Sequence, residues 1–309
     1  MVMRTNIPSR DDVVGYFSSL SNWGRWGRED QRGTLNLITD ETVRQSSTLV
    51  RSGRRVSLGR TIKPGGTEPN PPLHFMISSG DSSPAHGFGG ATDWFGLAFH
   101  GHSVTHLDAP SHIFWDGKTF NGLDAGRVTT ARGAQVGSVE LAANGIIARA
   151  VLADIPRHRG VARISGSEPI FSDELDSCLK SEGVQVHTGD VLLVRTGRDV
   201  APATTDPHES GSVHPGLHAE CLQWLHSHDI SMLGADVAQE VQPSGYDDLV
   251  FPLHAVAIVA IGLWLIDNLF LEDLASACGD FGTWEFLFLL APLRLKNTTG
   301  SPVNPIAVF

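Results

Sequence analysis

The stretch HGHSVTHLDAPSH, residues 100–112, places four histidines and one aspartate close together in the sequence. Imidazole nitrogens and a carboxylate suit Zn²⁺, Mn²⁺ or Fe²⁺. Three protein ligands leave positions for water, which is the pattern of a catalytic rather than a structural site. The spacing of His102, His106, Asp108 and His112 therefore predicts a metal site. The alternative interpretation is a polar loop whose histidines cap turns or bond the backbone.

The periodicity of this stretch favours a strand over a helix. On a strand His102, His106 and Asp108 share one face, whereas on a helix Asp108 would lie about 200° round from His106. Pro110 and the β-branched neighbours also disfavour a helix. An ideal strand would separate His102 from His106 by about 13 Å, so the chain must bend between them if both bind one ion.

The motif T-H-x-D-x-P-x-H at residues 105–112 resembles that of the cyclase-like metal-dependent hydrolase family, which includes bacterial kynurenine formamidases and isatin hydrolase. The similarity covers most of the chain, through GDVLLVRTG, the region of His254 and the C-terminal segment, and points to the longer members of the family. The family motif has glycine where this chain has Val104. Because valine is larger and stiffer than glycine, this difference is expected to change the shape of the pocket more than the identity of the ligands.

The resemblance implies roles by position. His102, His106 and Asp108 correspond to the primary metal ligands, and His112 corresponds to the catalytic histidine beside them. The metal is expected to be zinc or manganese, with one or two ions per chain.

Two later residues decide the number of metals. In the formamidase branch a histidine and a glutamate complete a two-metal site. In this chain His254 corresponds to that histidine, and Asp267 takes the place of the glutamate. Because aspartate is one methylene shorter, Asp267 could bind directly, bind through water, or leave a one-metal site as in the isatin hydrolase branch. The alternatives are a solvent-facing helix start for His254 and a helix N-cap for Asp267.

The predicted function follows from this ligand set. We expect metal-activated water to hydrolyse a C–N bond in an amide, formamide or cyclic amide of a small, aromatic substrate. His112, with an ordinary pKa near 6.5, would take a proton from the water and return it to the leaving group. The alternative is a lactone hydrolase, or a cyclase or dehydratase of secondary metabolism, that uses the same metal site.

Aromatic side chains flank the motif on both sides: Trp94, Phe95, Phe114 and Trp115. They could form the wall of an apolar substrate pocket, or they could pack in the core.

The fold implied by the resemblance is α/β, a single compact domain over residues 1–309 with a curved, barrel-like mixed sheet flanked by helices, of the swivelling β/β/α type. Residues 1–54 would form a helical and loop extension. Hydrophobic patterns predict strands at 55–61, 149–156, 189–197, 230–237 and 284–295, and helices at 172–183 and 215–229. Residues 254–266 could be either. Residues 63–93, rich in Gly, Pro and Ser, predict a long loop.

The composition limits the partners and the compartment. The 309 residues carry a net charge of −11, which argues against a nucleic acid or an anionic membrane as partner. Cys178, Cys221 and Cys278 are far apart and odd in number, so a disulfide framework or a thiolate zinc site is not expected. Without a leader or membrane-spanning pattern, we expect a cytoplasmic protein with a small-molecule substrate. The relatives imply a homodimer or a higher homo-oligomer.

Overall fold

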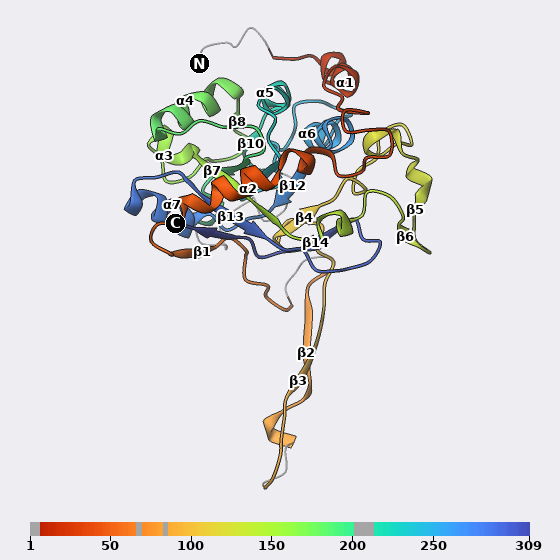
Figure 1. Cartoon of the computed structure of the whole chain (residues 1–309), viewed down its shortest axis with the longest axis vertical. Helices are drawn as coiled ribbons and strands as arrows, with labels where there is room; N and C mark the ends of the chain where they lie inside the picture. The colour runs from red at the N-terminus through yellow and green to blue at the C-terminus, as the bar shows by residue number, and fades with distance from the viewer. Residues whose placement is uncertain (1–6, 66–69, 83–85, 201–212) are drawn as a thin grey trace.

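The computed structural model describes residues 7–65, 70–82, 86–200 and 213–309. A nine-stranded mixed sheet forms its centre (Figure 1). In spatial order its strands are β1 (Arg55–Ser57), β15 (Ile306–Val308), β13 (Glu285–Leu290), β7 (Ile146–Asp154), β9 (Val191–Arg195), β11 (Met232–Ala235), β12 (Trp264–Asp267), β4 (His106–Asp108) and β14 (Gly300–Pro302). The predicted α/β fold with a curved mixed sheet is therefore confirmed.

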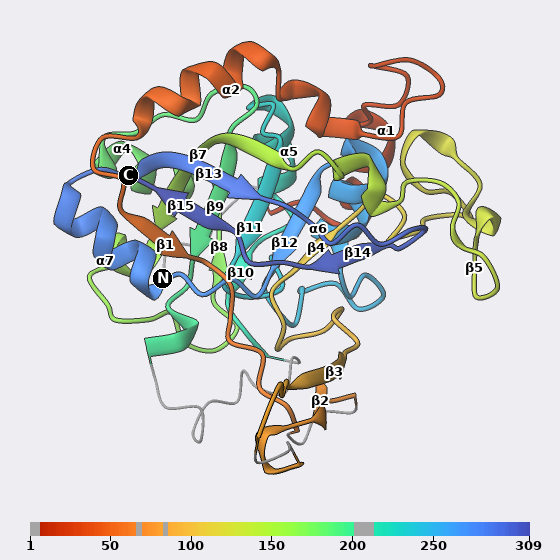
Figure 2. The same ribbon diagram turned by 60° about the horizontal axis from the view of Figure 1, so that its bottom comes forward.

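The middle of the sheet is parallel and the two sides are antiparallel. β7, β9, β11 and β12 run parallel to one another, and every residue of β9, β11 and β12 is buried. Such strands are covered on both faces, which is why they read as continuous apolar runs. Antiparallel strands extend the sheet on each side, and the whole sheet curls (Figure 2).

Helices cover the sheet. They are α1 (Arg10–Ser19), α2 (Asp40–Ser46), α3 (Ile155–Arg159), α4 (Ser172–Glu182), α5 (Cys221–Ser227), α6 (Pro252–Val256) and α7 (Glu272–Phe281). α2 and α4 pack against β7, and α7 packs against β1. α4 confirms the helix predicted there: it has acidic residues in its first turn and ends at Gly183, whose φ of 72° suits glycine.

Short elements complete the chain. Single-turn 3-10 helices lie at Gly33–Leu37, Ser47–Leu49, Gly80–Ser82, Phe120–Gly122, Ala125–Arg127, Val139–Ala142 and Arg198–Val200. Two small sheets pair β8 (Pro169–Ile170) with β10 (Gly216–Leu217), and β5 (Val128–Thr129) with β6 (Gly133–Ala134). Among the described residues, no helix combines the length and apolar character needed to cross a membrane.

Three predicted segments differ from the structure. The helix expected at 215–229 is shortened to α5, because residues 216–217 pair with β8 instead. Residues 254–266, where helix and strand competed, contain both: α6 continues as a π-helical turn over Ala257–Ile261, and the chain turns at Gly262 into β12. The strand expected at 55–61 stops at Ser57.

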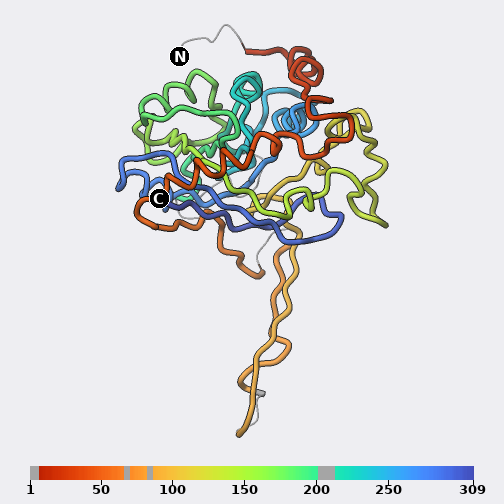
Figure 3. The backbone as a smooth tube through the Cα atoms, viewed as in Figure 1, coloured from red at the N-terminus to blue at the C-terminus, as the bar shows by residue number. Residues whose placement is uncertain are grey.

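A fourth difference is an arm. The long loop expected at 63–93 contains a β-hairpin, β2 (Leu73–Ser78) paired with β3 (Thr92–Gly96). It projects away from the body of the protein (Figure 3). In the sequence of 63–93 most of the Gly, Pro and Ser residues fall outside the two strands, so the composition of the whole segment hides two short strands.

Candidate metal centre

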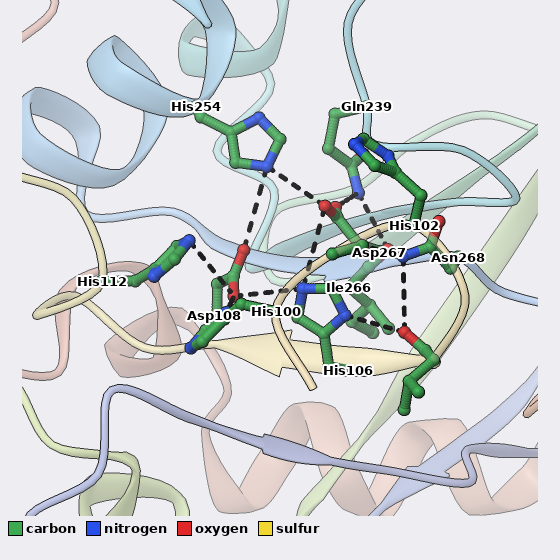
Figure 4. Close-up of polar contacts among 12 residues, drawn as sticks. His100, His102, His106, Asp108, His112, Gln239, His254, Ile266, Asp267 and Asn268 are labelled. Carbon is green, nitrogen blue, oxygen red and sulfur yellow. Dashed lines mark hydrogen bonds and ion pairs between the residues drawn. The ribbon is translucent and has the colours of Figure 1, made fainter. Parts of the chain in front are cut away.

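Two neighbouring antiparallel strands bring three potential ligands together. β12 pairs with β4 so that Asp267 lies opposite His106, and Leu265 lies opposite Asp108. Residues two apart on a strand share a face, so His106, Asp108 and Asp267 all point to the same side (Figure 4). All three are buried. The prediction that residues 106–108 form a strand, with His106 and Asp108 on one face, is thus confirmed.

His254 reaches the same place from α6. Its Nε2 lies 3.3 Å from Asp267 Oδ2 and 3.8 Å from Asp108 Oδ2. Its Nδ1 hydrogen-bonds the carboxylate of Glu240, which is also buried. Because a carboxylate accepts, Nδ1 is the donor and Nε2 is the nitrogen that faces the two aspartates. His254 is therefore buried in the cluster and is not a solvent-facing residue.

His106 is oriented in the same way. Its Nδ1 donates to the carbonyl oxygen of Val104 at 2.8 Å. Its Nε2 faces Asp108 Oδ1 at 3.6 Å and Asp267 Oδ2 at 4.0 Å. A backbone carbonyl that fixes the tautomer of a histidine is typical of metal ligands.

The chain bends just before β4, and this changes which histidine joins the cluster. His100 Nδ1 lies 2.9 Å from Asp108 Oδ1. The ring of His102, by contrast, lies 6.1 Å from the ring of His214, and Figure 4 draws it on the Gln239 side of the site. The structure thus brings together His106 and Asp108 of the predicted ligand set, with His100 in the position expected for His102.

Asn268 holds this bend in place. Its φ is 57°, and its side-chain amide donates to the carbonyl oxygens of Gly101 (2.7 Å) and Val104 (3.3 Å). The hydroxyl of Thr105 in turn donates to the carbonyl of Asn268 at 2.6 Å. Residues 101–104 are therefore tied to the end of β12 instead of continuing β4 as a strand.

Gln239 fixes the carboxylate of Asp267. Its side-chain amide donates to Asp267 Oδ1 and to the carbonyl of Ile266, both at 2.8 Å. Oδ2 is thereby left to face His254 and His106. Asp267 is a buried member of the cluster, and the N-cap interpretation is wrong: α7 begins five residues later and its N-cap is Leu271.

The charges of the cluster are strongly coupled. Burial would raise the pKa of Asp108, but His112, His106 and His100 outweigh it and hold that pKa well below the ordinary value. Burial would lower the pKa of His254, but Glu240 and Asp267 raise it well above the ordinary value. His254 in turn lowers the pKa of Asp267 against the effect of burial. The site therefore concentrates ionised carboxylates that require positive charge nearby.

The donor set fits a divalent cation. Two groups have ligand atoms within 4.8 Å of one another: His100, His106 and Asp108, and Asp108, His254 and Asp267. Both oxygens of Asp108 and Nδ1 of His100 are buried and make no hydrogen bond of acceptable geometry. Buried polar atoms without partners are rare unless an ion or water completes them. Nitrogen and carboxylate ligands of this kind suit zinc or manganese.

His112 stands beside the cluster and belongs to neither group. Its ring stacks on that of His100, with centroids 3.9 Å apart, and its Nε2 lies 3.9 Å from Asp108 Oδ1. Burial is the main reason that its pKa falls to about 4. Burial thus moves the pKa of His112 down from the ordinary value near 6.5.

The four predicted pocket aromatics lie in different places. Trp94 and Phe95 are exposed on β3 of the projecting arm, away from the cluster. Trp115 stacks on Phe17 at 4.3 Å, which is packing between loop and helix. Phe114 is exposed two residues beyond His112. In one chain, then, Trp94, Phe95 and Trp115 do not form a wall of this site.

Other residues at the site were not predicted. The ring of Phe99 lies 4.5 Å from that of His100, and the ring of Phe251 lies 5.8 Å from that of His254. Gly300 on β14 lies against His100, because a Cβ there would come within 3.0 Å of the imidazole. Phe99 and Phe251 precede His100 and His254 in the sequence by one and three residues, whereas Gly300 reaches the site from a distant strand.

Comparisons with known proteins agree with this geometry. A family model described as "Putative cyclase" matches residues 56–239. Cyclase-like protein 3 of Oryza sativa subsp. japonica is 28% identical over 214 residues, 67% of this chain. The chain spans 62% of the length of that protein. A kynurenine formamidase of Bacillus cereus is 27% identical over 205 residues, covering 66% of this chain and 75% of that enzyme.

Solved structures share the fold. A crystal structure described as a novel cyclase superposes with a TM-score of 0.85 and 28% identity, covering 94% of this chain and 100% of that one. Isatin hydrolase A from Labrenzia aggregata superposes with a TM-score of 0.60 and 21% identity, covering 84% of this chain and 94% of that one. At that identity the second match shows a common fold and no more.

Proposed function

We propose that this chain, which belongs to the cyclase family, is a metal-dependent hydrolase that cleaves the C–N bond of an amide. The observation that carries the proposal is the pair of ligand groups that share Asp108. A single carboxylate common to two groups suits two neighbouring cations. The kynurenine formamidase of Bacillus cereus, whose name describes an amide hydrolase, supports the reaction class.

The ligands would divide between two ions. His100, His106 and Asp108 would hold one, and Asp108, His254 and Asp267 would hold the other. A divalent cation at such a site supplies Lewis acidity toward a carbonyl oxygen and lowers the pKa of water to near neutrality. Glu240 and Gln239 keep His254 and Asp267 in the orientation that this requires.

His112 is the residue placed to move protons. It lies beside Asp108 without joining either ligand group, and its lowered pKa keeps it neutral and able to accept a proton above about pH 4. Amide nitrogen is a poor leaving group unless it is protonated, so the imidazolium formed by His112 would donate that proton to the nitrogen. This completes an acid–base cycle on one side chain.

The surroundings favour an apolar acyl or aryl group in the substrate. Phe99 and Phe251 stand against His100 and His254, and Phe114 follows His112 with its side chain exposed. Planar rings of this kind contact aromatic substrates well. We therefore propose a small aromatic amide, either an N-formyl arylamine or a cyclic amide fused to a ring.

A substrate panel tests this proposal. Purified protein supplied with Zn²⁺ or Mn²⁺ is assayed against an N-formyl arylamine, a cyclic aryl amide and an aromatic lactone, in water enriched in ¹⁸O. We expect ¹⁸O in the new carboxylate of an amide product, and no turnover by Asp108→Asn. Turnover of the lactone alone would favour the lactone hydrolase, and a product without ¹⁸O would favour a cyclase or dehydratase; either result would overturn the proposal.

A further inference from the structure

The helix that carries His254 ends in a stretch of buried backbone. α6 begins at Pro252 and continues as a π-helical turn to Ile261, and Gly262 then turns the chain at a φ of 74°. The last carbonyls of a helix have no partner within it. Residues 256–262 are all buried, and a buried carbonyl without a hydrogen bond is costly. Donors from elsewhere in the chain are therefore needed at this end of the helix.

Two adjacent residues near the start of the chain supply donors to three of these carbonyls. The backbone N–H of Asn22 donates to the carbonyl of Ala260 at 2.9 Å, and its side-chain amide donates to the carbonyl of Ile261 at 3.0 Å. The indole N–H of Trp23 donates to the carbonyl of Val259 at 2.7 Å. Asn22 is itself buried, so these bonds form in a protected environment where they are stronger than in water.

Thr34 extends the cap to a fourth carbonyl. Its backbone N–H and its hydroxyl donate to the carbonyl of Gly262 at 3.0 and 3.1 Å. The two backbones approach closely here, because a Cβ on Gly33 would come within 2.2 Å of the Gly262 oxygen. Residues 22–34, the capping loop, thus bond the four consecutive carbonyls of residues 259–262.

The capping loop is also held by contacts that do not involve the helix. The side-chain amide of Asn121 donates to the carbonyls of Gly27 and Asp30 at 3.0 and 2.8 Å. The neighbouring ring of Phe120 packs on the turn after the helix, where a Cβ on Gly262 would come within 2.5 Å of it. A loop ordered by its own contacts loses little further conformational entropy when it caps the helix.

The other end of the helix is fixed at the metal centre. The backbone N–H of His254 donates to Glu240 Oε1 at 3.2 Å, and its Nδ1 bonds the other oxygen of the same carboxylate. The helix is therefore held between Glu240 at its start and the capping loop at its end. Because a helix transmits displacement as a rigid element, the cap sets the position of the His254 imidazole relative to Asp267.

We propose that the capping loop positions His254 as a ligand of the second ion, so that residues at the other end of the chain set how tightly that ion binds. This inference rests on the proposed function, in which Asp108, His254 and Asp267 hold the second ion. The first ion serves as an internal comparison, because His100 and His106 come from β4 and the bend before it. Loss of the cap should therefore weaken the second ion far more than the first.

The Zn²⁺ affinities of the two sites test this positioning. Metal-free protein is titrated with Zn²⁺ against a competing chelator, and the second ion is identified as the one lost in Asp267→Asn. Trp23→Phe removes the N–H donor and keeps an aromatic ring. We expect it to bind the second ion about tenfold more weakly, the lower end of the effect of residues that orient a metal ligand, and the first ion as the wild type does.

Trp26→Phe is the matched control, because Trp26 lies on Arg25 in the same loop and its replacement leaves the four capping interactions in place. We expect both affinities of this variant to equal those of the wild type. An unchanged second-ion affinity in Trp23→Phe would overturn the proposal. An equal loss at both ions would also overturn it, because that result indicates general destabilisation.

The imidazole signals of the metal-free protein separate this inference from the proposed function. The Nδ1–H of His254 is hydrogen-bonded to the buried Glu240, and its ¹⁵N–¹H NMR signal is assigned by its absence from His254→Gln. We expect the signal to shift in Trp23→Phe and to stay in place in Trp26→Phe. A wild type that binds no Zn²⁺ would overturn the proposed function, whereas an unmoved signal in Trp23→Phe would overturn positioning by the capping loop.

Discussion

Asp267 lies directly opposite His106 where β12 pairs with β4, and its Oδ2 is 4.0 Å from the imidazole Nε2. This register sets the geometry of the site, because it places Asp108 and Asp267 on the same face of two neighbouring strands. A slip by one residue would turn one of these side chains to the other face of the sheet. The antiparallel pairing therefore places Asp108, which both ligand groups share, on the same face as Asp267.

The variant Asp267→Asn tests whether the chain binds a second ion through Asp267. The amide keeps the shape of the side chain but is a weak metal ligand, so we expect the content to fall from two ions to one per chain. Asp267→Glu should retain two, because it keeps a carboxylate at this position. Metal analysis of both variants decides this, with the exposed Asp280→Asn as control. An undiminished metal content in Asp267→Asn would remove Asp267 from the ligand set.

Substitutions can show whether His100 or His102 binds the metal. His100 Nδ1 lies 2.9 Å from Asp108, whereas His102 belongs to neither ligand group. We expect His100→Ala to weaken metal binding at least tenfold, and His102→Ala to change it much less. Titration of the metal-free protein with Zn²⁺ measures both. The opposite order would restore the assignment predicted from the sequence.

His112→Ala should separate catalysis from metal binding. We expect a fall in kcat of about 10²–10⁴ with an unchanged metal content, since His112 is in neither ligand group. His158→Ala, an exposed histidine at the end of α3, is the control. A variant that lost metal together with activity would make His112 a ligand instead of a base.

The pKa of His112 also sets a pH limit. Because burial lowers this pKa to about 4, the neutral base is present at pH 5–8 and is lost as the pH falls through about 4. The His112-dependent part of the rate should therefore be level above pH 5. A rise with a midpoint near pH 6.5 that is present in the wild type and absent from His112→Ala would show an unperturbed histidine at work.

Stability should depend on pH through Glu182, far from the site. Burial raises the pKa of its carboxyl from 4.5 to about 8, so between these values the folded protein binds more protons than the unfolded chain. The free energy of unfolding should then fall by about 1–3 kcal/mol as the pH rises from 4.5 to 8. Urea unfolding should show a smaller fall for Glu182→Gln, and the wild-type fall for the exposed Glu29→Gln. Equal falls in wild type and Glu182→Gln would contradict this.

Local patterns in the sequence predicted much of the sheet. Apolar runs marked β7, β9 and β11, and the helix predicted at 172–183 is α4. The arm was missed because its two short strands are separated by glycines, prolines and serines, whose composition indicates a loop. Such strands become recognisable when their pairing partner is known.

The site was predicted only in part, because some of its residues are positioned by contacts with distant parts of the chain. His106 and Asp108 follow from strand periodicity, and His254 and Asp267 followed from the resemblance. His100 did not, because the bend that brings it in depends on Asn268, which is distant in the sequence. Glu240 and Gln239 orient their partners by hydrogen bonds that have no local sequence pattern.

Metal analysis of the purified protein tests the central claim most directly. Protein prepared without chelator, or reconstituted with Zn²⁺ or Mn²⁺ and freed of excess, is measured by mass spectrometry for moles of metal per chain. We predict two for the wild type and none for Asp108→Asn, which removes the ligand common to both groups. A wild-type chain that holds no metal after reconstitution would contradict the account.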